Sequence, residues 1–496
     1  MADRLIIVSN RLPVVFEKKE NEWVLKPGSG GLVAALAPVL SNRGGVWIGW
    51  PGIVDAEMPS TAGLLETQGR TSGYILHAVP LSDEELQLYY HGFSNEILWP
   101  LFHDLQSRCN FDPRYWAVYQ DVNARYAAAI REVYQDGDFI WVHDYHILLA
   151  GRKMRELGMT SSIGFFLHIP FPSLDIFVKL PWRFPILQAL LQYDLIGFQT
   201  ARDRRNFISC VRELLPEVQI STQGALTVFT SENRTMRAGC FPISIDFQDF
   251  NVRSATREVS DASWYLHERY PERQILLGVD RLDYTKGIPF RLRAFRELLR
   301  RYPDTQRQVT LIQVVVPSRA DIPEYNELKT EIERLVGEIN GEFTQSGWVP
   351  IHYLYRHLGK TDLLAYYRTA EIALITPLKD GMNLVAKEFC ATKIQDDGVL
   401  ILSEFAGAAS QLQRYALLVN PYDIEGVADT IYRAVLMPAE ERRTRMRRMR
   451  ASIKRHDVFW WVDIFLDVAF AKDLMDFPLM DEYVPTMENL HDATST

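Results

Sequence analysis

The segment Thr376-Pro-Leu-Lys-Asp-Gly-Met-Asn-Leu-Val-Ala-Lys-Glu388 decides the fold class of this chain. It follows the apolar run 372–375, which is typical of a buried strand, and it leads through an Asp-Gly turn into residues 383–392, whose composition favours a helix. The first backbone N–H groups of a helix have no internal acceptor, and the helix dipole favours negative charge there. The segment therefore predicts a strand–turn–helix unit of an α/β protein that binds an anion.

Two carboxylates flank this turn. Asp380 and Glu388 are about two helical turns apart, and an acid at a phosphate site needs another task, for which hydroxyl recognition is the obvious one. The pattern predicts a sugar nucleotide, with its diphosphate on the N–H groups and its hydroxyls on the acids. Taken alone, however, Asp-Gly is also ordinary turn chemistry in any α/β protein.

A second segment favours the ligand site over the ordinary turn. Residues 278–287 follow the apolar run 275–277 and place Arg281 and Lys286 at the end of a predicted strand. Open α/β sheets bind ligands at the carboxyl ends of their strands. Two cations at one strand end and a helix N-terminus at another are able to hold a departing diphosphate.

Length, charge and cysteine content narrow the class of protein. The chain has 496 residues, which predicts two domains, and its net charge of −9 argues against general affinity for nucleic acid or an anionic membrane. No apolar run is long enough to span a bilayer, and the first residues predict a strand and not a signal peptide. The four cysteines are widely spaced without metal-type pairs, so we expect reduced thiols in a cytosolic protein.

Short apolar runs alternate with helical patterns through the first half of the chain. Such alternation predicts a parallel sheet with right-handed crossovers. The predicted strands are 5–8, 46–49, 139–142, 164–168 and 195–197. The predicted helical segments between them are 31–40, 84–90, 118–133 and 147–157.

The second half repeats this alternation after a region of weak periodicity at 242–252, where we expect the domain boundary. Its predicted strands are 275–279, 309–316, 372–375 and 399–403, and its predicted helices are 288–300, 325–339 and 363–368. Two doubly wound domains that face each other leave a cleft between the carboxyl ends of their strands, which is a favoured place for a ligand.

Features near the C-terminal end point away from a ligand role. The basic run 440–450 is compatible with RNA or an acidic partner, but a solvated helix face is more common and the acidic net charge favours it. The aromatic cluster 459–461 favours core packing or docking between domains. Residues from 481 onward are typical of a loosely ordered tail.

A series of motifs, in order, resembles the trehalose-6-phosphate synthases, a family of retaining glycosyltransferases. The resemblance runs from about Arg4 to Asp467, nearly the whole chain. The motifs that carry it are Val8-Ser-Asn-Arg-Leu-Pro13, Gly28-Ser-Gly-Gly31, Gly45-Val-Trp-Ile-Gly-Trp50, Tyr89-Tyr-His-Gly-Phe-Ser-Asn-Glu-Ile-Leu-Trp-Pro100, Trp141-Val-His-Asp-Tyr-His146, Gly164-Phe-Phe-Leu-His-Ile-Pro-Phe-Pro172, Asp280-Arg-Leu-Asp-Tyr-Thr-Lys-Gly287, Pro317-Ser-Arg319 and Lys379-Asp-Gly-Met-Asn-Leu-Val-Ala-Lys-Glu388.

The resemblance implies an α/β fold of the GT-B type, with two facing Rossmann-like domains and the active site in the cleft between them. It implies an acceptor-binding domain at 1–245, a nucleotide-sugar-binding domain at 246–455, a C-terminal helix at 456–480 that packs back on the first domain, and a flexible tail at 481–496. The implied reaction moves glucose from UDP-glucose, or another nucleotide-linked glucose, to glucose 6-phosphate with retention of configuration. Its product is α,α-trehalose 6-phosphate, in the first step of trehalose synthesis.

For the donor, the resemblance implies that Arg281 and Lys286 hold the diphosphate and that Glu388 holds the ribose hydroxyls. His168 is expected beside the transferred glucose, and a mobile loop is expected to approach the donor through its glycines. The remaining residues implied to contact the donor are Gly30, Gly31, Asp380, Gly381, Met382, Asn383, Leu384 and Val385. The implied catalytic set is Arg281, Lys286, Asp380 and His168, with no bound metal or other cofactor.

For the acceptor, the resemblance implies that Arg11 and Arg319 bind the 6-phosphate with help from Tyr90. Trp99 is expected to form a wall of that pocket, and Asp144 is expected to hold sugar hydroxyls. Arg11 is the hardest of these to explain otherwise. An arginine directly after a buried strand needs an anion, because it cannot lose its charge.

Most of these residues also have a structural interpretation. His168 fits a core histidine at a strand end, and Asp144 fits a hydrogen-bond network with its neighbours. Tyr90 and Trp99 fit core positions. The His and Asp residues within 143–146 are of metal-ligating types, but their spacing is weak evidence and the family resemblance implies no metal.

Two other functions stay open at this point. A sister enzyme would use another acceptor, such as glycerol 3-phosphate, and a non-catalytic sensor would bind sugar phosphate and regulate partners. The intact acceptor set favours a sugar phosphate, and the intact donor clamp favours catalysis. A separate phosphatase would then act on the product, while the nucleotide preference, the formation of a homo-oligomer and the role of a hairpin-like insertion at 14–26 are not decided by the sequence.

Overall fold

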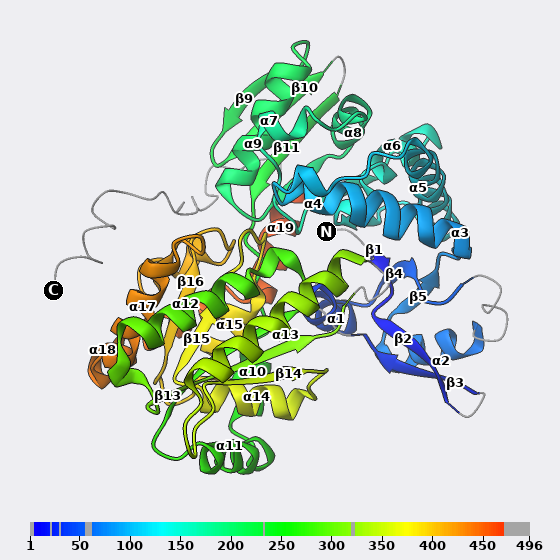
Figure 1. The fold of residues 1–496 in the computed structure, drawn as a ribbon. Coiled ribbons are helices and arrows are strands. Elements are labelled where there is room, and N and C mark those ends of the chain that lie inside the picture. Colours follow the sequence, from blue (N-terminus) through cyan, green and yellow to red (C-terminus); the bar gives the residue numbers. More distant parts are fainter. Residues whose placement is uncertain are drawn as a thin grey trace. The chain divides into compact units, whose positions relative to one another are not determined.

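In this computed structural model, the residues described are 4–19, 22–28, 31–54, 62–231, 234–318 and 323–470. They form two compact units, coloured along the chain in Figure 1. The first unit extends to Ile243 and resumes at Val458, and the second runs from Ser244 to Asp457. The sequence predicted domain limits, that is, the bounds of parts that fold independently. These limits stay a prediction.

The first unit is built on a nine-stranded sheet in the order β5-β4-β1-β6-β7-β8-β11-β10-β9. Strands from β5 to β11 in this order are parallel, and β10 and β9 are added antiparallel at one edge. The strands are β1 Leu5–Arg11, β4 Val46–Trp50, β5 Ile75–Ala78, β6 Phe139–His143, β7 Ser162–Phe166, β8 Leu195–Phe198, β9 Gln219–Gln223, β10 Leu226–Ser231 and β11 Arg234–Cys240.

The strand order of this sheet changes direction at β1. Its partners are β4 on one side, with Ile6 opposite Val46, and β6 on the other, with Ile6 opposite Ile140. Counted along the chain, β5-β4-β1-β6-β7-β8 follows the order 3-2-1-4-5-6 that is typical of doubly wound α/β folds. Ligands of such folds bind at this switch point, so the ends of β1 and β6 are the place to look.

Helices connect and cover these strands. The helical elements of the first unit are α1 Gly31–Arg43, α2 Ala62–Ser72, α3 Asp83–Glu85, η2 Leu86–Leu98, α4 Trp99–Phe102, η3 Gln106–Arg108, α5 Pro113–Val133, η4 Tyr145–Ile147, α6 Ala150–Glu156, α7 Leu174–Phe177, α8 Arg183–Leu190, α9 Ala201–Leu214 and α19 Val458–Phe470. The last helix joins this unit by packing, since buried Trp461 donates from Nε1 to the carbonyl of Phe241 at 3.0 Å.

A separate antiparallel hairpin follows β1. Its strands are β2 Val14–Lys19 and β3 Glu22–Pro27, and the edge of the Phe16 ring packs on Trp23 with centroids 6.1 Å apart. In Figure 1 the hairpin runs beside α2, which contacts β3. The hairpin-like insertion expected at 14–26 is therefore confirmed.

The second unit has a six-stranded, wholly parallel sheet in the order β14-β13-β12-β15-β16-β17. Counted along the chain this is again 3-2-1-4-5-6, with the switch point between β12 and β15. The strands are β12 Gln274–Arg281, β13 Val309–Val316, β14 Ile351–Tyr355, β15 Ile372–Ile375, β16 Val399–Ser403 and β17 Leu417–Val419. Their near-continuous apolar sequences are those of strands covered on both faces.

The helical elements of the second unit are α10 Phe247–Ser254, α11 Arg257–Arg269, η5 Tyr284–Lys286, α12 Ile288–Arg301, η6 Pro303–Thr305, α13 Pro323–Phe343, α14 Lys360–Thr369, α15 Leu384–Thr392, α16 Ala409–Leu412, α17 Ile424–Leu436 and α18 Ala439–Arg455. The basic run lies on α18. Its arginines pair with carboxylates of the same unit, as in Arg442 with Asp397 at 2.8 Å and Arg450 with Asp396 at 2.8 Å. The run was predicted to be a solvated helix face; the structure places it on a helix, and Arg442 and Arg450 are largely covered by these contacts.

Some predicted elements have other bounds in the structure. The strand expected at 164–168 is β7 Ser162–Phe166, so His168 lies beyond its end. The helix expected at 84–90 is a single turn followed by the π-helix η2, which continues to Leu98. The region 242–252, expected to be irregular, contains the start of α10.

Candidate functional site

The two motifs of the second unit meet at its switch point. Lys286 follows β12 and Asp380 follows β15, and Lys286 Nζ lies 2.5 Å from Asp380 Oδ2. Both side chains are mostly buried, at 14% and 10% exposed. Arg281 is the last residue of β12 and is exposed. The structure therefore brings together the cation and the acid that the sequence placed in separate motifs.

The turn that carries Lys286 depends on a glycine. Gly287 follows η5 with φ of 65°, in the left-handed region. A Cβ atom there would lie 2.5 Å from the carbonyl oxygen of Thr376, at the end of β15. Glycine is thus required both by the backbone conformation and by the close approach of the two strand ends.

The N-terminus of α15 is arranged by Asp380 and Asn383. Asp380 accepts from the Met382 amide at 3.1 Å and from Asn383 Nδ2 at 3.2 Å. Asn383 has φ of 62° and caps the helix by accepting from the Ala386 amide at 3.2 Å. The amides of Leu384 and Val385 belong to the first helical turn and have no intrahelical acceptor, so they are available to an anion.

Arg291 links the strand ends at this switch point. It was not identified as important from the sequence. Its side chain is fully buried on α12 and pairs with Asp280, the residue before Arg281. It also donates to Gln313 Oε1 and to Thr376 Oγ1, each at 3.1 Å. A fully buried arginine needs such partners. The signal that could have revealed it is its place on the apolar side of α12, between Ile288 and Phe295, although four other arginines lie on the same helix.

Glu388 lies on the second turn of α15, and its pKa is raised by burial. Its Oε2 accepts from the hydroxyl of Tyr367, on α14, at 3.0 Å. This tyrosine was also missed, because nothing in the sequence relates α14 to α15.

The cation at the switch point of the first unit is Arg11, the exposed last residue of β1. Its guanidinium lies 4.5 Å from the ring centroid of Trp50 and 5.6 Å from that of Tyr90. Tyr90 in turn stacks on His146 with centroids 5.8 Å apart. Within the described part of the chain, no carboxylate forms an ion pair with Arg11. The aromatic rings position its guanidinium, whose charge remains for an anionic ligand.

The ends of β6 and β7 carry a buried histidine pair. Nδ1 of His143 and Nε2 of His168 are 3.1 Å apart, and both rings are almost fully buried. Burial lowers the pKa of His168 to about 3 and that of His143 well below its usual value, so both are neutral. Asp144, between these strands, accepts from the His168 amide at 3.3 Å and has a φ of 75°, which is strained for a non-glycine residue.

Trp99 is buried in the first unit, and 7% of its side chain is exposed. Its ring packs on His103 and Tyr145, with centroids 4.3 and 5.8 Å away. Asn95 links this group to Tyr90, because it accepts from the Tyr145 hydroxyl at 3.0 Å and donates to the Tyr90 carbonyl at 2.7 Å. Trp99 therefore has the contacts of a core residue, and its expected place in the acceptor pocket stays a prediction.

Parts of the predicted site fall outside the residues that the structure describes. These are Gly30 and Arg319; Gly31 is described as the first residue of α1. Among the described residues, no group of three or more His, Cys, Asp or Glu side chains is placed to hold a metal ion. None of the helices in the described part of the chain is long and apolar enough to cross a membrane.

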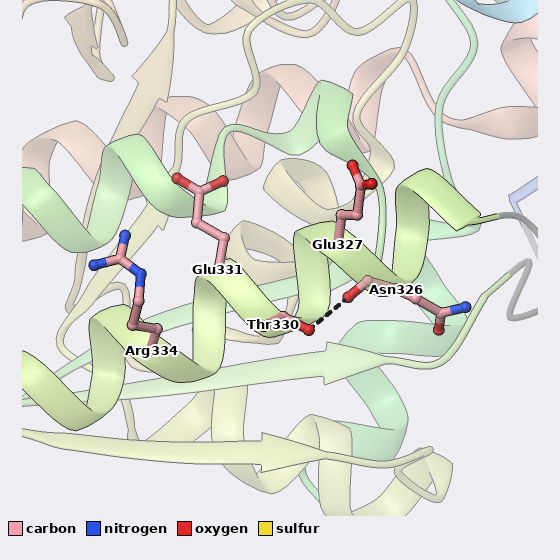
Figure 2. Close-up of a pocket in the computed structure, with 5 residues that line it drawn as sticks. All are labelled: Asn326, Glu327, Thr330, Glu331 and Arg334. Carbon is pink, nitrogen blue, oxygen red and sulfur yellow. Dashed lines mark hydrogen bonds between the residues drawn. The ribbon is translucent and has the colours of Figure 1, made fainter.

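A hollow of about 460 Å³ lies on α13, and none of the residues assigned above lines it. It is lined by Asn326, Glu327, Thr330, Glu331 and Arg334, all from one helix, and Figure 2 shows Glu327 and Glu331 pointing to the same side. Glu331 is paired with Arg293 at 2.5 Å, and Arg334 is paired with Glu338. Surface ion pairs account for Glu331 and Arg334, and we assign the hollow no role.

Each unit contains six parallel strands in the order 3-2-1-4-5-6 and has a cation at its switch point, an arrangement that fits the two-domain glycosyltransferases. The sequence profile of Glycosyltransferase family 20 matches residues 3–470. The chain belongs to this family. The predicted family, α/β fold and enzyme class are thereby confirmed.

Relatives and solved structures agree with this placement. The chain is similar to the trehalose-6-phosphate synthase of Mycobacterium bovis, at 42% identity over 93% of each chain. It is also similar to that of Mycolicibacterium smegmatis, at 40% identity over 98% of this chain and 96% of the relative.

Among solved structures, it resembles a UDP-forming α,α-trehalose-phosphate synthase from Burkholderia xenovorans in complex with glucose 6-phosphate. The TM-score is 0.85 at 33% identity, over 94% of this chain and 100% of the other. It resembles the E. coli protein bound with UDP-2-fluoro glucose with a TM-score of 0.83 at 35% identity, over 94% and 98% of the two chains.

Proposed function

We propose that this enzyme transfers glucose from UDP-glucose to glucose 6-phosphate and releases UDP and α,α-trehalose 6-phosphate. The observation that carries the proposal is the meeting of Lys286 and Asp380 at the switch point between β12 and β15. The relatives that are trehalose-6-phosphate synthases support this choice of substrates.

In the donor half, Arg281 and Lys286 bind the diphosphate together with the first amides of α15. One of the three Lys286 protons is directed at Asp380, which leaves two for phosphate oxygens. Asp380 also orients the turn before α15 and accepts from the donor glucose, and Glu388 holds the ribose. The donor-contact set is completed by Gly30, Gly31, Gly381, Met382, Asn383, Leu384 and Val385.

In the acceptor half, Arg11 binds the 6-phosphate beside Tyr90, with Arg319 as the second cation. Aromatic contacts to Trp50 and Tyr90 fix the position of Arg11 without neutralising it, which suits a dianionic ligand. Asp144 accepts from sugar hydroxyls, Trp99 forms a wall of the pocket, and neutral His168 lies beside the transferred glucose.

The reaction proceeds on one face of the donor sugar. The bond from the anomeric carbon to the diphosphate breaks as the bond to the acceptor hydroxyl oxygen forms, and a leaving phosphate oxygen takes the hydroxyl proton. Configuration is retained without a protein nucleophile. The protein positions two sugars and stabilises the departing diphosphate, which explains cations and amides where a hydrolase carries paired carboxylates.

The setting of the enzyme follows from its substrates and composition. Four free cysteines suit a reducing compartment, and we place the enzyme in the cytoplasm. Its partners are the two small substrates and, in the pathway, a separate phosphatase that acts on the product. The net charge of −9 argues against nucleic acid or a membrane as a partner.

The test is to incubate the protein with UDP-glucose and either glucose 6-phosphate or glycerol 3-phosphate. UDP release is followed, the product is identified by mass and NMR, and a reaction without acceptor measures hydrolysis. We expect α,α-linked trehalose 6-phosphate with glucose 6-phosphate alone. A product formed from glycerol 3-phosphate would contradict glucose 6-phosphate as the acceptor. If no nucleoside diphosphate is released from any of several nucleotide-linked glucoses, the remaining function is that of a sugar-phosphate sensor.

A further inference from the structure

The carboxylate of Glu388 has few partners of its own. Burial raises its pKa, and its one hydrogen bond from a described side chain comes from Tyr367 Oη, 3.0 Å from Oε2. Within the described part of the chain, no lysine or arginine forms an ion pair with it. A carboxylate offers about four acceptor sites, so most of them remain for donors supplied by a ligand.

Tyr367 is buried, and its hydroxyl contacts Glu388. Its side chain is 1% exposed, and its ring meets that of Phe389 edge to face with centroids 6.4 Å apart. Burial and the nearby carboxylate raise the pKa of Tyr367 well above its usual value, so the phenol keeps its proton. The hydroxyl is therefore a fixed donor whose position is set by the packing of α14.

We propose that Tyr367 is a positioning residue for the nucleotide sugar, which holds Glu388 so that its remaining acceptor sites receive the two ribose hydroxyls. This inference rests on the proposed function, since it takes Glu388 as the ribose-binding residue. The physical reason is preorganisation. The carboxylate of a glutamate rotates broadly about its last torsion, and fixing one oxygen in advance lowers the ordering cost of binding.

The simpler interpretation is that Glu388 merely satisfies a buried phenol. Buried tyrosine hydroxyls usually have a hydrogen-bond partner whatever their function. The two interpretations differ in what happens when the ribose hydroxyls are absent, because positioning of Glu388 matters only to a ligand that uses it.

The test compares UDP with 2′,3′-dideoxyuridine 5′-diphosphate by calorimetry on the full chain. The wild-type protein is expected to bind UDP at least about tenfold more tightly than the dideoxy analogue. Tyr367→Phe should weaken UDP binding about three- to tenfold and leave the analogue unchanged. Tyr366→Phe, at the neighbouring position on α14, is the matched control and should change neither.

The outcomes separate the two proposals. If wild-type protein binds both diphosphates equally, Glu388 does not read the ribose and that part of the proposed function fails. If it distinguishes them and Y367F does so to the same degree, the positioning role of Tyr367 is wrong. A variant that weakens both ligands alike would show general damage to the unit and would also overturn the role.

A second variant distinguishes loss of positioning from a general disturbance of packing. In a Glu388→Ala background, the further change Y367F should have no effect on UDP binding, since the group that Tyr367 positions has been removed. An equal loss in both backgrounds would mean that Tyr367 acts through packing. KM measurements should follow the same pattern, with KM for UDP-glucose raised and KM for glucose 6-phosphate unchanged.

Discussion

Lys286 and Asp380 are 94 residues apart in the chain and 2.5 Å apart in the structure. Their contact shows how single residues act here: an acid that would otherwise repel phosphate orients the cation that attracts it. Arg11 is placed by a different means, since aromatic faces hold it and leave its charge for a ligand.

Removal of the Lys286 charge should affect turnover more than folding. We expect Lys286→Ala to lower kcat by about 10²-fold or more, as does deletion of one preorganised donor to a developing charge. Steady-state UDP release measures this. Lys329→Ala, which removes a lysine paired with Glu333 on the surface of α13, should leave kcat unchanged. Normal kcat in K286A would contradict the role of Lys286.

At the scale of elements, the helix that carries Tyr90 differs from what the local sequence predicts, whereas α15 agrees with it. The π-helix η2 carries both Tyr90 and Asn95, and such helices are rare and often found at functional sites. Its geometry depends on distant partners, since Tyr89 donates to Asn10 at 3.0 Å. Gly92 is needed too, because a Cβ there would lie 2.8 Å from the ring of Tyr115 on α5.

Helix α12 is attached to the strand ends through Arg291, and this attachment should dominate the stability of the second unit. Arg291→Met leaves the Asp280 carboxylate buried without its cation, so we expect a loss of about 3–5 kcal/mol in the free energy of unfolding. Urea titration measures it. Arg293→Met, on the same helix but paired at the surface with Glu331, should cost no more than about 1 kcal/mol. Equal losses in the two variants would contradict this view of Arg291.

At the scale of the whole molecule, buried neutral histidines couple stability to pH. Histidine has a pKa near 6.5 when unfolded, whereas that of folded His168 is about 3 and that of His143 is well below 6.5. Below pH 6.5 the unfolded chain therefore binds protons that the folded chain does not. Their contribution is fully present above pH 6.5 and is lost as pH falls, by about 1.4 kcal/mol per pH unit for each histidine.

The check is the slope of the unfolding free energy between pH 5 and pH 6, a window that lies within this loss. We expect His143→Phe to have a shallower slope than the wild-type protein by about 1.4 kcal/mol per pH unit. Trp141→Phe, which changes a buried ring beside His143 and keeps both histidines, should leave the slope unchanged. An unaltered slope in H143F would contradict the neutral buried pair.

The sequence by itself determined the family, the alternation of strands and helices, and the motifs that end at β1, β6, β12 and β15. It did so because hydrophobic periodicity, glycine turns and charged residues at strand ends are local properties of the sequence, which can be recognised without a structure. Tertiary structure alone decided the two switch points, the Lys286–Asp380 contact, and the hydrogen bonds of Arg291 and Tyr367. These depend on which strands become neighbours and on how helices pack across them, and packing between distant segments leaves no periodic signal in a single chain.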